Sequence, residues 1–164
     1  MERIVVGLDG SSDSVRALEW AVGMAECSGA EVVAVHAWTR PSHLAGMLGA
    51  DSEEARRQTR IMFENDWCRP LTEARVSYRP VFCEGNPVSA LIKTAMEERA
   101  DLIVVGARGL GGFAELLLGS VSQQLAGHAP VPVVVVPPSP RPLSAERKKA
   151  YAVASQHLSF SEMS

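Results

Sequence analysis

The sequence predicts an α/β fold: a doubly wound open parallel sheet of five strands with helices on both faces. Three observations favour this fold class. Five short apolar segments alternate with segments of helical periodicity along the whole chain. Several of the apolar segments are near-continuous runs of valine and isoleucine, which is typical of parallel strands buried on both faces. A glycine-rich loop follows the fourth apolar run and leads into a helix.

The first part of the chain predicts a strand, a helix and a strand, over residues 3–8, 13–28 and 31–38. Ser11 or Ser12 can cap the helix, and Gly29 suits the left-handed residue that often ends one. Its apolar residues recur at helical spacing, so we expect these four in the core: Val15, Leu18, Val22 and Ala25.

A second helix and an edge strand are predicted next. The helix covers residues 51–68 and is expected to bury three side chains, those of Ile61, Met62 and Trp67. Pro70 interrupts this helix or starts a second short one. Residues 76–84 are expected to form the third strand, and Pro80 inside it predicts an edge position because proline has no N–H group to donate to a neighbouring strand.

The remaining elements complete the alternation. Asn86 and Pro87 have the order of a cap and a first helical residue, and they open a helix over residues 87–99. Its inward residues are expected to be Leu91, Ile92, Ala95 and Met96. A strand, a helix and a final strand follow, over residues 102–106, 120–128 and 131–136. We therefore expect one domain over residues 1–138 and a tail, partly helical or disordered, over residues 139–164.

The glycine-rich loop is the best candidate for a binding site. Its spacing is G-x2-G-x9-G-S, from Gly106 through Gly109 to Gly119 and Ser120. Backbone N–H groups can approach an anion where no Cβ intervenes, and the start of a helix adds partial positive charge. The loop therefore predicts the binding of a phosphate-bearing ligand.

Parts of the loop also resemble three other kinds of segment. Gly109, Gly111 and Ala114 spell G-x-G-x-x-A, a dinucleotide fingerprint, but no acidic residue follows at the required distance. A Walker A loop needs a lysine before its serine, and the residue before Ser120 is glycine. The third interpretation is a surface turn in which Ser120 caps the helix and Gln123 completes a capping box.

With its preceding strand and the N-terminal segment V-G-L-D-G-S, the loop resembles the ATP-binding branch of the universal stress protein family. The resemblance implies a Rossmann-like sheet of flavodoxin-like order 3-2-1-4-5, a regulatory role in stress response and a homodimer formed through strand 131–136. It implies ATP as ligand, with Mg²⁺ or Mn²⁺ held by the phosphates. It also implies these binding residues: Gly7, Leu8, Asp9, Ala37, Val105, Gly106, Arg108, Gly109, Gly119, Ser120, Val121 and Ser122.

Several of these residues keep a second interpretation. Asp9 can accept hydrogen bonds from a ribose or an adenine amino group, or it can cap the next helix. Arg108 can pair with phosphate oxygens or point to solvent. Ser120 and Ser122 can donate to phosphate, and Ser120 can also ligate a phosphate-bound metal ion. AMP or a cyclic nucleotide remains an alternative to ATP, because the adenosine half of such a site is separate from the phosphate half.

Catalytic residue patterns are sparse, so we expect binding, with slow ATP hydrolysis or a nucleotide-independent dimeric interaction protein as alternatives. The four histidines are isolated, and His36 is interpreted as a structural residue. A net charge of −3 gives no general attraction to nucleic acid, and no run of about 18 apolar residues predicts a membrane span. Three cysteines without a C-x-x-C pair predict a reducing cytoplasm.

Overall fold

The computed structural model describes residues 1–40, 52–110 and 118–138, so the predicted tail over residues 139–164 lies outside the described residues. Five parallel strands form one sheet of order β3-β2-β1-β4-β5. This order and the parallel pairing confirm the predicted fold. The strands are β1 Arg3–Gly7, β2 Glu31–Trp38, β3 Tyr78–Glu84, β4 Leu102–Gly106 and β5 Val133–Val136.

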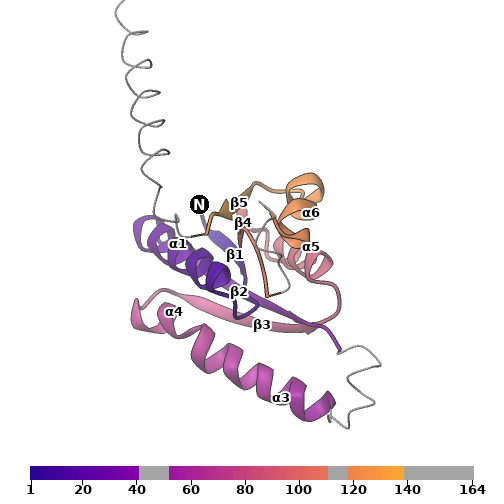
Figure 1. Cartoon of the computed structure of the whole chain (residues 1–164). Coiled ribbons are helices and arrows are strands. Elements are labelled where there is room, and N and C mark those ends of the chain that lie inside the picture. The colour runs from indigo at the N-terminus through magenta and orange to yellow at the C-terminus, as the bar shows by residue number, and fades with distance from the viewer. Residues whose placement is uncertain (41–51, 111–117, 139–164) are drawn as a thin grey trace, which may run out of the picture.

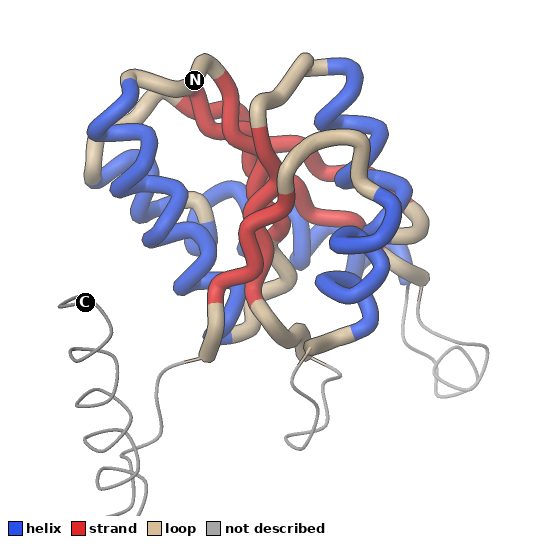
Figure 2. The backbone as a smooth tube through the Cα atoms, turned by 90° about the horizontal axis from the view of Figure 1, so that it is seen from above, coloured by secondary structure: helices blue, strands red, loops and turns tan. Residues whose placement is uncertain are grey.

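Helices cover both faces of the sheet (Figures 1 and 2). One face carries α1 Ser12–Ser28, α3 Ser52–Met62, η1 Phe63–Trp67 and α4 Arg69–Glu73; the other carries α5 Pro87–Glu97 and α6 Ser120–His128. Each face has its own apolar cluster. Leu18, Phe63 and Leu71 pack on the first, and Leu91 and Leu125 pack on the second.

The predicted helix boundaries rest on caps that the structure contains. The Ser11 side chain accepts a hydrogen bond from Ser14 N at the start of α1, and Gly29 ends this helix at a φ of 71°. Asn86 Oδ1 accepts from the backbone N–H groups of Val88 and Ser89 at the start of α5. Because these side chains satisfy helix N–H groups that have no partner within the helix, the helices begin where the sequence indicates.

Pro80 lies in β3 at one edge of the sheet, as predicted, and β5 forms the other edge. The interior strand β1 pairs with β2 and β4 on its two sides. Both edge strands are two residues shorter at the N-terminal end than predicted, because residues 76–77 and 131–132 have no strand geometry. The central position of β1 and β4 brings their carboxyl ends next to each other.

Several predicted core residues are exposed instead. Val15 of α1 and Met96 of α5 are 38% and 63% exposed, because their helices face the sheet through stripes that contain Ala17, Ala21 and Ala95. The predicted helix over residues 51–68 is not continuous: after Met62 it widens into the π turn η1. This turn places Phe63 in the core, which the sequence did not predict. The three residues that were expected to be buried, Ile61, Met62 and Trp67, are exposed or half-buried.

Candidate functional site

A cavity of about 780 Å³ lies at the carboxyl ends of β1, β2 and β4. Parallel strands end at the same edge of the sheet, so this is the place where a doubly wound fold binds ligands. All twelve residues singled out from the sequence line this cavity, although they come from four separate parts of the chain: Gly7, Leu8, Asp9, Ala37, Val105, Gly106, Arg108, Gly109, Gly119, Ser120, Val121 and Ser122.

The Asp9 carboxylate connects the end of β1 to the glycine loop. Its Oδ1 accepts hydrogen bonds from the N–H and hydroxyl of Ser11, at 3.0 and 2.6 Å. Its Oδ2 accepts from Leu110 N at 3.0 Å, across about a hundred residues of sequence. Asp9 does not cap α1 directly, because the N-cap is Ser11; it braces the turn through Ser11 and adds a contact to the loop that the sequence did not indicate, while its contact with a ribose or adenine stays a prediction.

The glycines of the motif leave room for the protein's own atoms. A Cβ on Gly106 would lie 2.6 Å from the backbone carbonyl of Asp13, in the first turn of α1. A Cβ on Gly109 would collide with Asp9 Oδ2. At Gly119 it would come within 3.3 Å of Ala107 O. The protein's own packing therefore requires small residues at Gly106 and Gly109, which the sequence did not indicate, and the approach of a ligand to these glycines stays a prediction.

The Arg108 guanidinium is engaged by a carboxylate. Its Nε lies 3.3 Å from Oδ2 of Asp13, and the two side chains are 25% and 9% exposed. Asp13 is in the first turn of α1, where a negative charge is favourable, and it lies behind the cavity wall formed by Gly106. The sequence interpretation offered phosphate or solvent as the partner of Arg108, and it missed this buried acid.

Helix α6 begins at the cavity without a side-chain cap among the described residues. Its N-cap is Gly119, so the capping box starting at Ser120 is wrong. Ser122 is buried, and its hydroxyl donates to the carbonyl of Ala107 or Gly119, at 2.8 and 2.9 Å. Ser120 is exposed at the cavity. The Ser122 hydroxyl thus donates within the loop, and its contact with a phosphate stays a prediction. The first N–H groups of α6 have no capping side chain among the described residues.

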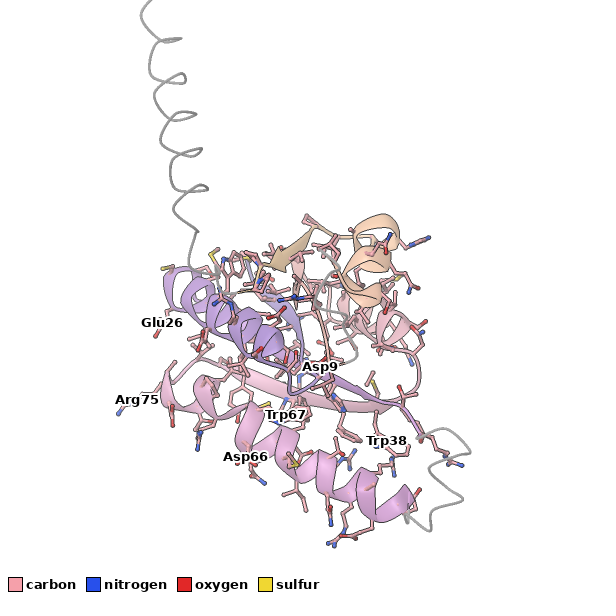
Figure 3. All side chains as sticks on the ribbon, viewed as in Figure 1. Asp9, Glu26, Trp38, Asp66, Trp67 and Arg75 are labelled. Atoms are coloured by element: carbon pink, nitrogen blue, oxygen red, sulfur yellow. The ribbon has the colours of Figure 1, made fainter. Side chains whose placement is uncertain are left out.

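An aromatic wall closes the cavity opposite the loop. It consists of three rings, those of His36 and Trp38 from β2 and of Trp67 from η1, together with the thioether side chain of Met62 at the end of α3. The His36 and Trp67 rings are 5.1 Å apart in a T-shaped arrangement. Figure 3 shows Asp9 and Trp67 together at the end of β1, and Trp38 at the end of β2. The sequence placed His36 and Trp38 at the carboxyl end of their strand, but it missed Met62 and Trp67 as cavity residues, because the π turn that positions Trp67 has no recognisable sequence signature.

His36 is a neutral member of this wall at pH 7. Its Nδ1 donates to the carbonyl of Leu8 at 2.7 Å, since a carbonyl can only accept. Burial lowers the pKa of His36, against the opposing effects of this hydrogen bond and of the Asp9 charge. The expected structural role is thus present, and the ring also lines the cavity.

The charged side chains among the described cavity residues are one acid, Asp9, and one base, Arg108. No group of three or more histidine, cysteine or acidic side chains within residues 1–40, 52–110 and 118–138 could hold a metal ion. That Ser120 ligates a metal ion bound to the phosphates of a ligand stays a prediction. None of the described helices is long and apolar enough to span a membrane.

Comparisons with known proteins agree with this geometry. The sequence model of the universal stress protein family matches residues 1–137. A universal stress protein of Thermus aquaticus is 34% identical over 133 residues, covering 81% of this chain and 96% of the relative. The structure of UspA from Lactobacillus plantarum superposes with a TM-score of 0.65 at 22% identity, over 82% of this chain and 97% of the other. A universal stress protein solved in complex with cAMP is 30% identical, with a TM-score of 0.59 over 82% and 95% of the two chains.

Proposed function

The chain belongs to the universal stress protein family, and from this premise we propose that it is a regulatory adenine-nucleotide-binding protein that acts in stress response. The ligand occupies the cavity at the carboxyl ends of β1, β2 and β4. The glycine motif favours ATP, with Mg²⁺ or Mn²⁺ on its phosphates. AMP and cyclic AMP share the same adenosine half and are alternatives for the same cavity.

The observation that carries the proposal is the convergence of an aromatic wall and an uncapped helix start on one cavity. The wall, with His36, Met62 and Trp67, suits a flat apolar base. The first N–H groups of α6 suit phosphate oxygens. The cavity is large enough for a nucleotide, since small-molecule sites usually measure about 300–1,000 Å³. The relative bound to cAMP supports an adenine ligand.

Nucleotide binding in the cavity would change the conformation of the protein through the contacts of the glycine loop. Leu110 N is held by Asp9, and Arg108 is held by Asp13 at the start of α1. A phosphate group that bound beside Gly109 and Gly119 would change the position of the loop and of α1 together. We place this action in the cytoplasm, where the three free cysteines would stay reduced.

A matched pair of glycine substitutions on α6 tests the proposal. In Gly119→Val the new side chain meets Ala107 O and the Arg108 backbone at the cavity, whereas Gly127→Val enters open space outside it. Calorimetry with Mg²⁺ and ATP, AMP or cyclic AMP should give a wild-type Kd below about 1 mM. Gly119→Val should weaken binding at least about tenfold and Gly127→Val should not.

Equal binding by all three proteins would place the ligand elsewhere. If the wild type binds none of the three nucleotides with a Kd below about 1 mM, the proposed nucleotide binding is wrong. Mass spectrometry of small molecules released from freshly purified, denatured protein would identify a ligand that copurifies.

The edge position of β5 favours a second element of the proposal, a homodimer. β5 pairs only with β4 in the described sheet, so its outer backbone groups can pair with another copy. Val133→Lys or Val135→Lys should convert a dimer into monomer on sedimentation. Both side chains also pack against the second apolar cluster, so thermal unfolding must accompany the measurement. A dimer that persists in variants of unchanged Tm would contradict this interface.

A further inference from the structure

The cavity has little positive charge with which to hold a highly charged ligand. From Gly106 to Ser122 the sequence contains one basic residue, Arg108, and one acidic residue, Glu115. Among the described lining residues, the Arg108 charge is matched by Asp9. Arg40 and Arg60, which directly follow the lining residues Thr39 and Thr59 in sequence, form ion pairs with Glu84 and Glu64, at 3.9 and 3.8 Å.

Asp13 reduces this positive charge further. Its side chain is 9% exposed and lies 3.3 Å from the Arg108 Nε, so the two charges face each other in a poorly hydrated place. It is held there by packing, because the Asp13 backbone fills the space that a Cβ on Gly106 would need. Asp13 itself does not line the cavity. With Asp9, Asp13 and Arg108 counted together, this end of the site has one more acid than base.

A ligand in this place is therefore stabilised mainly by backbone dipoles. The start of α6 provides about half a unit of positive charge, which suits one or two phosphate charges but not four. Charges that are partly removed from water interact more strongly than exposed ones, so the carboxylate behind the wall opposes each added phosphate charge.

We propose that Asp13 is a specificity-determining positioning residue: by engaging Arg108 it limits the phosphate charge that the cavity accepts. The site then takes nucleotides carrying about one or two negative charges, namely a cyclic or simple monophosphate, or ATP whose charge a divalent cation has partly neutralised. This inference rests on the proposed nucleotide function and adds the charge class of the ligand.

The test compares Asp13→Asn with the wild type across ligands that share adenosine and differ in charge. Asparagine keeps the shape of the side chain and an oxygen acceptor for Arg108 but removes the charge. Calorimetry at low ionic strength uses adenosine, cyclic AMP, AMP, and ATP with EDTA or with Mg²⁺. In the wild type, ATP with EDTA should bind at least about tenfold more weakly than AMP.

Asp13→Asn should strengthen binding of metal-free ATP about tenfold, AMP less, and adenosine not at all. Glu26→Gln is the matched control, since it removes the same charge from the far end of α1, on an exposed residue (Figure 3). It should leave every affinity unchanged. Adenosine affinity and Tm report whether Asp13→Asn has folded normally. Arg108→Gln is the second variant and should weaken ATP more than adenosine.

Distinct outcomes separate this inference from the proposed function. If the wild type binds adenosine and metal-free ATP equally well, or if Asp13→Asn changes all ligands by the same factor, charge selection is wrong while nucleotide binding stands. If the wild type binds none of the five ligands, the proposed function fails and this inference with it. An Arg108→Gln variant with unchanged ATP affinity would also overturn the role of the ion pair.

Discussion

The turn after β1 offers a sharp test of how the aromatic wall is held. Gly10 has a φ of 82°, and a Cβ there would lie 2.6 Å from the Trp67 ring. Gly10→Ala therefore meets two penalties: the left-handed backbone, at roughly 1–2 kcal/mol, and overpacking against the indole, at roughly 1–3 kcal/mol. We expect a loss of about 2–5 kcal/mol in the free energy of unfolding, measured by urea denaturation.

Gly29→Ala is the matched control for this substitution. Gly29 has a similar φ of 71°, but nothing lies within 4 Å of its added Cβ. It should cost only the backbone penalty, about 1–2 kcal/mol. The difference between the two variants measures the Trp67 contact. In a Trp67→Leu background that difference should shrink, because a smaller side chain leaves space. Equal destabilisation by both alanines, or an excess that persists without Trp67, would refute the reasoning.

Three further predictions concern single side chains. Burial raises the pKa of the Cys68 thiol to about 12, so at pH 8 Cys68 should resist a thiol reagent that labels the exposed Cys27; rapid labelling of Cys68 in folded protein would contradict its burial. Because burial lowers the pKa of His36 below its unfolded value, the unfolded chain binds more protons, and stability should fall as pH drops below about 6.5; urea denaturation should show a shallower loss in His36→Asn. Asn86→Ala should cost about 1 kcal/mol through loss of its two N-cap hydrogen bonds, and a change within error of zero would mean that α5 is held by packing alone.

Much of the fold was predictable because its signals are local. Ser11, Gly29 and Asn86 act on the turn in which they stand, so their roles follow from the sequence around them. Pro80 likewise indicated an edge strand from its missing N–H group. The order of the sheet came from the family resemblance, since periodicity carries no information about which strands are neighbours.

The parts that were not predictable depend on contacts between distant segments. The pairing of Arg108 with Asp13 joins residues 95 positions apart. The burial of Phe63 and the placement of Trp67 depend on a π turn that changes the helix register after Met62. A helical wheel drawn from the sequence continues the α-helical period through that point, so it selects the wrong residues as buried. The twelve assigned binding residues share a cavity, and their contacts with a ligand stay a prediction.

The close packing around Gly106, Gly109 and Gly119 has a consequence for how such a signature should be used. Gly106 and Gly109 must stay small for the loop to fold against α1 and Asp9, and a side chain at Gly119 would crowd the Ala107 carbonyl and the Arg108 backbone, whether or not a ligand occupies the cavity. A descendant that had lost its small molecule would still be under pressure to retain all three. The ligand of such a chain is better predicted from the side chains of the aromatic wall, including Met62 and Trp67, than from the spacing of its glycines.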